Sequence, residues 1–181
     1  MNGAICLALF CFFCQFSPVT AISSQTPYKD TQWEELVPKM WRPDLAFDGL
    51  DLENLPDNDP RVAKAYEAFM AEWEKAPVNE AMDGQQIKIL GFIAPLDWEN
   101  DAELKEFLLV PYFGACIHLP PPPANQIIYV KMEKALKGVQ LMDAVWASGI
   151  IYVERNDSGS LGASGYRMKI EKVEPYTPDD T

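Results

Sequence analysis

The sequence predicts a mainly β protein with flanking helices, an α+β chain centred on one small barrel. Three observations lead to this prediction. The chain has 181 residues, about one domain, and 48% of them are apolar, which argues against disorder. Short segments of strand composition, separated by turn residues, follow Asp83. Apolar residues at helical spacing are found before that point.

Residues 1–21 have the composition of a secretory signal peptide. Residues 4–14 form an apolar run of the length of a signal-peptide core, too short for the roughly 20 residues that span a bilayer, and the small-residue sequence VTA follows. We therefore predict cleavage after Ala21 and an exported, periplasmic protein. Membrane anchoring is not expected, because a phenylalanine rather than a small residue precedes both Cys11 and Cys14, the cysteines that a lipid would modify.

Residues 22–82 are predicted to form a polar N-terminal arm followed by a helical region. Thr31 stands three residues before Glu34, and this capping-box pattern predicts a short helix that ends before Pro38. An irregular linker is expected to follow as far as Pro56, anchored by its leucine and phenylalanine side chains.

A longer helix is expected to begin at Asp59 and Pro60, because proline is favoured in the first turn of a helix, and to end before Pro77. Apolar residues fall on one face of this helix. Their spacing predicts that the face packs onto a sheet rather than forming a ligand groove: Val62, Tyr66, Phe69, Met70 and Trp73.

Residues 83–176 are predicted to form the barrel domain, and residues 177–181 a tail. The sequence NDSG at residues 156–159 predicts a hairpin turn, and a helical segment is expected around residues 133–141. Five segments have the composition of strands: 86–93, 107–110, 126–132, 145–154 and 166–173. Five strands with one helical excursion predict a small, five-stranded, OB-like, partly open barrel, with the earlier helices packed outside it.

The charge distribution argues against several classes of partner. The net charge is −12 and the isoelectric point is near 4.4, so the surface repels phosphate backbones and anionic lipid headgroups. Residues 29–106 hold 19 acidic and 8 basic side chains, whereas residues 107–174 hold 6 and 7. A barrel that binds oligonucleotides needs a basic groove with stacking aromatic side chains, and no basic cluster is visible. We therefore expect no nucleic-acid partner.

The only histidine, His118, lies two residues after Cys116, the single cysteine left once the leader is removed. Side chains at this spacing point to the same side of an extended segment, so a thiolate and an imidazole converge. They fit half of a tetrahedral zinc site, whose other ligands would be carboxylates, water, or the same pair from a second copy in a homodimer. Pro120–Pro123 form a stiff polyproline rod after the pair. Asn125 is placed to hold neighbouring groups.

Two other interpretations of the pair stay open. A small buried cysteine beside a hydrogen-bonded histidine would be purely structural. A nucleophilic Cys116, with His118 as its base and Asn125 orienting the imidazole, would make the protein a thiol enzyme of the cell envelope. No known cysteine-hydrolase signature surrounds the pair, and we do not predict an enzyme.

Four stretches of the sequence together resemble a known bacterial family. They are FLLVPYFGACIHLPPPPANQIIYV, GFIAPLDW, VWASGIIYVE and LGASGYRMKIEKVEPY, and they cover about residues 84–176. The family contains exported proteins and lipoproteins and is classified as a domain of unknown function. Its members are often encoded beside ABC transporters of the macrolide-exporter type, in settings linked to zinc supply. The resemblance implies an accessory, metal-handling protein of the periplasm, with Cys116 and His118 at the site and Asn125 behind them.

Three functions are consistent with these patterns. The first, which we predict, is a periplasmic accessory or binding protein that holds zinc or a similar transition metal at Cys116 and His118 and works with an ABC transporter. The second is a protein–protein interaction module in which the Pro120–Pro123 rod docks a partner and the Cys/His pair is structural. The third is the thiol enzyme.

Overall fold

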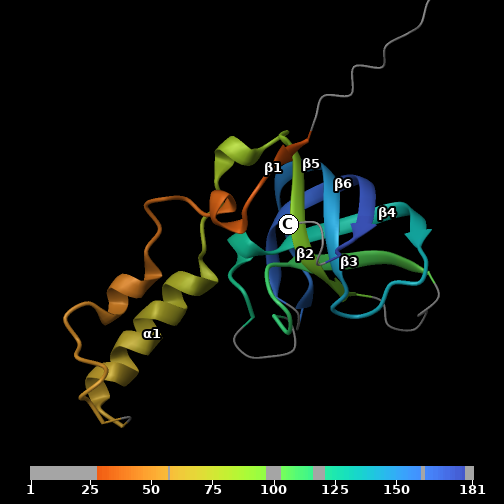
Figure 1. The fold of residues 1–181 in the computed structure, drawn as a ribbon. Helices are drawn as coiled ribbons and strands as arrows, with labels where there is room; N and C mark the ends of the chain where they lie inside the picture. Colours follow the sequence, from red (N-terminus) through yellow and green to blue (C-terminus); the bar gives the residue numbers. More distant parts are fainter. Residues whose placement is uncertain (1–27, 57, 97–102, 116–120, 160–161, 178–181) are drawn as a thin grey trace, which may run out of the picture.

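The computed structural model describes residues 28–56, 58–96, 103–115, 121–159 and 162–177. These residues form a closed five-stranded barrel from which a helical lobe projects (Figure 1). The predicted leader and its cleavage site lie outside them. Within the part of the chain that is described, no helix is long and apolar enough to cross a membrane.

The barrel confirms the predicted five strands and their OB-like architecture. Neighbouring strands pair in the order β2-β3-β4-β6-β5, and β5 pairs back with β2 to close the ring. The seam between β4 and β6 is the one parallel pairing in the ring and spans three residue pairs. The barrel is therefore closed rather than partly open. The strand bounds are β2 Gln86–Pro95, β3 Leu104–Val110, β4 Ile128–Leu136, β5 Ala144–Asp157 and β6 Ala163–Pro175.

Alternation of apolar residues explains why these segments form strands around one core. In β2, Ile87, Ile89 and Ile93 are fully buried, and the alternate residues Lys88, Leu90 and Phe92 are less buried. Each such side chain removed from water stabilises the fold by about 1.5–3 kcal/mol. Only glycine fits at position 149 on β5, because a Cβ atom there would lie 2.3 Å from the carbonyl oxygen of Lys169 on β6.

The hairpin predicted at residues 156–159 is present between β5 and β6. The Asp157 carboxylate accepts a hydrogen bond of 2.9 Å from the backbone N–H of Gly159, whose φ is +64°. The helix expected around residues 133–141 is absent. β4 continues to Leu136, which pairs with Leu104 on β3, because the apolar residues there have a barrel strand to pack against.

The N-terminal residues of the described chain join the barrel. Strand β1 (Lys29–Asp30) pairs in parallel with β2, and the N–H of Thr31 donates to the carbonyl of Lys88 at 2.9 Å. The predicted capping box is wrong by one residue. The short 3-10 helix η1 (Trp33–Leu36) is capped by Gln32, whose backbone N–H donates to the Glu35 carboxylate. Thr31 is already engaged by β2 and therefore does not cap.

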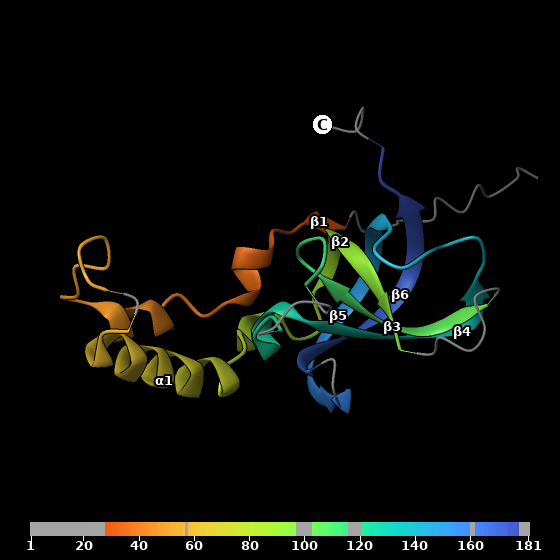
Figure 2. The same cartoon turned by 90° about the horizontal axis from the view of Figure 1, so that it is seen from below.

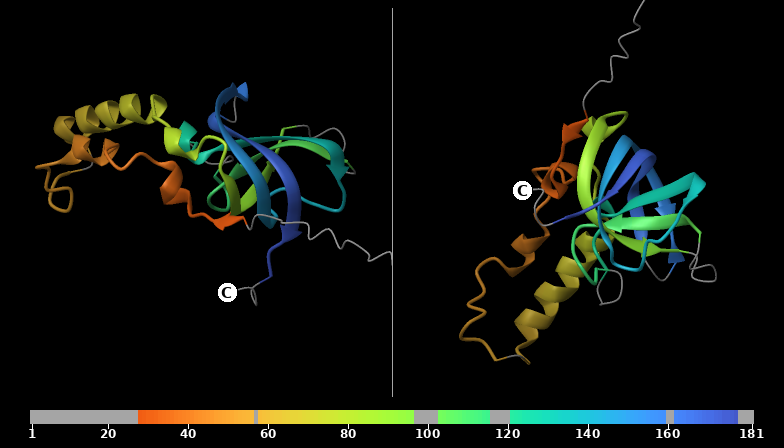
Figure 3. Two further views of the ribbon diagram at one scale, coloured as in Figure 1. Left: turned by 90° about the horizontal axis from the view of Figure 1, so that it is seen from above. Right: turned by 45° about the vertical axis from the view of Figure 1, so that its right-hand side comes forward.

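Helix α1 (Pro60–Glu74) begins and ends as predicted. The carboxylate of Asp59 accepts the N–H of Arg61 at 2.9 Å, as an N-cap does. The position of α1 differs from the expectation: the helix lies beside the preceding 3-10 helix η2 (Pro43–Phe47) and away from the sheet (Figure 2). Its aromatic face accordingly packs on η2. Phe69 and Phe47 have ring centroids 5.6 Å apart. We call residues 37–78 the helical lobe; both views of Figure 3 show it extending from the barrel.

Tyr166 on β6 holds both ends of the helical lobe at one point. Its hydroxyl donates to the carbonyl of Leu36 at 2.5 Å and accepts the N–H of Asn79 at 2.6 Å. The Asn79 side chain adds a 2.8 Å hydrogen bond to the carbonyl of Glu35. The lobe is thus an excursion that leaves and rejoins the barrel at the same buried side chain.

Candidate functional site

Of the three predicted site residues, Cys116 and His118 lie outside the described residues, and Asn125 lies within them. The structure places the two residues that flank the Cys/His segment, Ala115 and Pro121. The surroundings of these two residues and of Asn125 therefore define the candidate site.

The chain before Cys116 is fixed against the barrel. Gly114 has a φ of +82°, a conformation that favours glycine, and its N–H donates to the sulfur of Met142 at 3.3 Å. Ala115 is buried in a second apolar cluster, together with Ile127 and Met142. The Cys/His segment consequently starts from a packed position.

The proline run after His118 packs inside its own chain. Pro122 and Pro123 are buried, and Pro123 has the polyproline II conformation that was predicted, with φ −66° and ψ 156°. The carbonyl of Pro121 accepts a hydrogen bond of 2.9 Å from the indole N–H of Trp73 on α1. Pro122 and Pro123 are therefore not open to a docking partner in this structure, because the helical lobe and the barrel cover them.

Asn125 is fully buried in the short helix η4 (Ala124–Gln126) and carries an unused acceptor. Its Nδ2 donates to the carbonyl of Pro77 at 2.9 Å, whereas its Oδ1 has no hydrogen-bond partner among the residues that the structure describes. A buried acceptor left without a donor costs about 1–3 kcal/mol. This oxygen is therefore able to accept a hydrogen bond from one further donor.

Gly165 on β6 lets η4 lie close to the barrel. A Cβ atom at this position would be 2.5 Å from the Val78 side chain and 2.8 Å from the carbonyl oxygen of Ala124. The depth at which Asn125 is buried thus depends on the absence of a side chain at Gly165.

A cavity of about 570 Å³ lies between the end of α1, the proline run and the β5–β6 hairpin. Its wall is apolar at Trp73 and the prolines and charged at three positions that sequence analysis did not single out: Glu74, Arg155 and Asp157. The helical spacing marked Trp73 only as a packing residue. No local pattern reveals the contact of Trp73 with Pro121, since the two are 48 positions apart.

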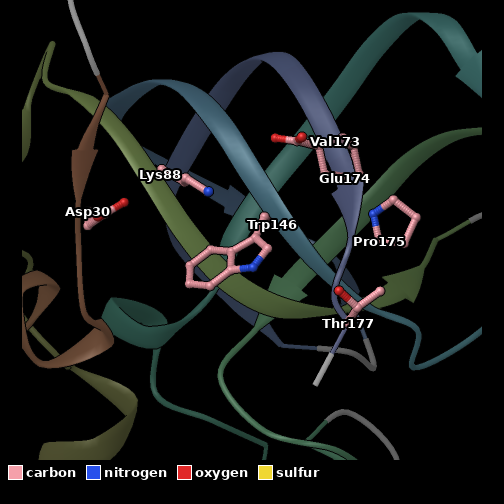
Figure 4. A pocket seen from close by; sticks show the side chains of 7 residues that line it. All are labelled: Asp30, Lys88, Trp146, Val173, Glu174, Pro175 and Thr177. Atoms are coloured by element: carbon pink, nitrogen blue, oxygen red, sulfur yellow. The ribbon is translucent and has the colours of Figure 1, made fainter. Parts of the chain in front are cut away.

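A second cavity, also of about 570 Å³, lies on the outside of the barrel near the ends of β1 and β6 (Figure 4). Its centre is Trp146, and the ammonium group of Lys88 lies 4.7 Å from the centroid of the indole. Asp30 and Glu174 also line it. This cavity includes none of the predicted site residues.

Among the residues that the structure describes, no group of three or more His, Cys, Asp and Glu side chains is arranged to hold a metal ion. The predicted metal site at Cys116 and His118, with Asn125 as an orienting group, falls partly outside these residues and stays a prediction. The orphaned Oδ1 of Asn125 fits this arrangement, because histidine ligands usually donate their second ring N–H to an oxygen.

Comparisons with known proteins agree on one family. A comparison with curated proteins finds no match. A crystal structure of a DUF3299 family protein from Pseudomonas aeruginosa PAO1 is similar, with 40% sequence identity and a TM-score of 0.60 over 83% of this chain and 97% of that chain. The model of a family described as "Protein of unknown function (DUF3299)" matches residues 33–175, which include both the helical lobe and the barrel. The chain therefore belongs to the DUF3299 family.

Proposed function

We propose that this DUF3299 protein is an exported accessory or binding protein that holds zinc or a similar transition metal at Cys116 and His118. The observation that carries the proposal is the buried, unpartnered Oδ1 of Asn125, seven residues after His118. An acceptor in this position would orient the imidazole through one ring N–H and leave the other nitrogen for the metal.

The chemistry of the pair favours zinc. A thiolate and a neutral imidazole are donors that zinc prefers, and both must be deprotonated to bind. Two protein ligands would make the ion exchangeable, as a carrier requires. Water, a carboxylate or the pair of a second copy would complete the coordination, and the last case would make the protein a homodimer.

The setting of this function would be the periplasm. The leader-like residues 1–21 support export, and the absence of a small residue before Cys11 and Cys14 supports release instead of lipid anchoring. An ABC transporter is the proposed partner, on the resemblance described above. Such a protein would carry the metal rather than catalyse a reaction.

The structure weakens one alternative and leaves another for experiment. A docking role for the proline rod loses support, because Pro122 and Pro123 are buried within the chain. For a thiol enzyme, Asn125 would orient His118 as a base instead of as a ligand. That function predicts selective alkylation of Cys116 at neutral pH, which zinc does not slow.

Native mass spectrometry and zinc titration calorimetry of the purified protein test the proposal. We expect the wild type to bind zinc, and the variants Cys116→Ser and His118→Ala to bind it at least about tenfold more weakly. Gln126→Ala serves as a matched control, because this neighbour of Asn125 is half-buried and has no proposed contact with metal. Equal zinc affinity in all four proteins would exclude the Cys/His site.

A further inference from the structure

The cavity beside Trp146 combines an aromatic side chain with charged ones on the outside of the barrel (Figure 4). Trp146 stands between Val145 and Ala147, which are buried in the core, so its half-buried indole points outward. The volume of about 570 Å³ is within the range of sites that hold small molecules. The cavity shares no residue with the predicted metal site and therefore requires an explanation of its own.

The pairing of the strands explains why these side chains meet. Lys88 on β2 is opposite Asp30 on β1 and Ser148 on β5. Trp146 lies two residues from Ser148, on the same face of β5, and is opposite Glu174 on β6. Charged side chains of both signs are thus fixed by the sheet around one indole.

The indole of Trp146 already holds a cation. The ammonium group of Lys88 lies 4.7 Å from the centroid of the ring. Among the described residues this ammonium makes no ion pair, although Asp30 is its neighbour on the adjacent strand. The face of an indole attracts cations, and proteins use such faces to recognise organic ammonium ligands. Lys88 thus occupies a position that an ammonium ligand would take.

The charges favour a cation over an anion as the ligand. Two carboxylates, those of Asp30 and Glu174, line the cavity, against the single ammonium of Lys88. Glu174 also pairs with Lys172 at 2.7 Å, so Asp30 is the carboxylate that has no ion pair within the described part of the chain. The net charge of −12 creates a field that attracts cations to the molecule and repels anions.

We infer that this cavity binds an organic ammonium group, and that Lys88 is an internal competitor that moves aside when the ligand enters. The displaced lysine has a partner in Asp30, opposite it in the parallel pair of β1 and β2. A second ring adjoins the site, because the centroid of Tyr176 lies 6.4 Å from that of Trp146. A quaternary ammonium suits the site best, since it needs no hydrogen-bond acceptor. This inference goes beyond the proposed function and does not depend on it.

A titration with choline, a free quaternary ammonium ion, tests the inference by nuclear magnetic resonance. We expect choline to shift the indole N–H signal of Trp146, and the shift to saturate. Saturation transfer to the choline methyl groups compares the variants. Trp146→Leu should weaken choline binding at least about tenfold. Tyr152→Leu is the matched control and should not change it: Tyr152 also holds a cation, the guanidinium of Arg167 at 4.7 Å, but does not line the cavity.

The sign of the effect of Lys88→Met tests the competition. Removal of the competing ammonium should tighten choline binding about threefold. Lys64→Met removes the same charge at an exposed position of α1 and should leave the affinity unchanged. Weaker choline binding in Lys88→Met would overturn the inference, because the lysine would then be part of the surface that binds the ligand.

Asp30→Asn keeps the test decisive if Trp146→Leu does not fold. It removes an exposed carboxylate from the cavity, and we expect choline to bind about two- to threefold more weakly. Circular dichroism identifies which variants are folded. Flotation with phosphatidylcholine vesicles would assign the site to a lipid headgroup, and choline binding without flotation to a free ion. If choline shifts the Trp146 signal neither in the wild type nor in Lys88→Met, the inference is wrong.

Discussion

At the scale of single residues, Tyr166 joins the barrel to both ends of the helical lobe. Its hydroxyl makes two hydrogen bonds, one to each end of the lobe. We expect Tyr166→Phe to lower the free energy of unfolding by about 1–3 kcal/mol, because the carbonyl of Leu36 and the N–H of Asn79 lose their partner. Urea unfolding measures this. Tyr66→Phe, at an exposed position of α1, should change the stability by less than about 0.5 kcal/mol.

Tyr166 should also make the free energy of unfolding depend on pH in the alkaline range. Burial raises the pKa of Tyr166 from 10.0 to about 12, because the ionised phenol would lose its hydration. The neutral hydroxyl thus contributes its full stability below pH 10, and this contribution is lost as the pH rises through 12. The loss is roughly 2 to 3 kcal/mol. Unfolding measured between pH 9 and 12 should show the stability difference between wild type and Tyr166→Phe shrinking; a constant difference would contradict the prediction.

At the scale of elements, the position of η4 depends on its close contact with β6. Gly165→Ala would place a Cβ atom 2.5 Å from Val78 and 2.8 Å from the backbone of Ala124. We expect a loss of about 1–3 kcal/mol in the free energy of unfolding, because backbone cannot yield as a flexible side chain does. Gly138→Asn is the control, since that position is open and asparagine tolerates its φ of +71°. An equal effect of both substitutions in thermal melts would contradict this explanation.

The elements also show how far sequence reasoning extends. The five strands and α1 are predictable because periodicity and turn or cap residues are local signals, as at Asp59 and Gly159. The segment that covers the apolar face of α1 is not predictable in this way. Apolar spacing indicates that a helix face is covered, but it does not identify the segment that covers it. Trp73, Pro121 and Asn125 likewise come together only through contacts of about 48 positions in separation. The Cys/His pair itself remains a prediction.

At the scale of the whole molecule, the two hydrogen bonds of the Tyr166 hydroxyl predict that the barrel can fold without the helical lobe. Leu36 and Asn79 meet at one hydroxyl, so a short glycine–serine linker can replace residues 40–76 without stretching the chain. Shortening a loop lowers the entropy cost of closing it. We expect a cooperative melt and a circular dichroism spectrum dominated by strand. A shortened protein that does not fold would show that the lobe is part of the folding unit.

The proposed export is also tested on the whole molecule. We expect the protein recovered from the periplasm to begin at Ile22, since the VTA sequence ends at Ala21. N-terminal sequencing and intact mass measure this directly. A chain that begins at Met1, or an acylated cysteine at the new terminus, would contradict the predicted cleavage.

The pairing of β1 with β2 protects an edge of the barrel. β2 bonds β5 along Gln86–Phe92 on one side, but on the other side β3 reaches only Phe92–Pro95. The gap is filled by β1, by Thr31 and by the indole of Trp33, which donates to the carbonyl of Leu90 at 2.7 Å. Unpaired strand edges recruit other chains and seed aggregation. A protease that removed the chain as far as Trp33 would therefore expose this edge of β2 and promote aggregation. Cleavage after Ala21 would leave β1, Thr31 and Trp33 in place.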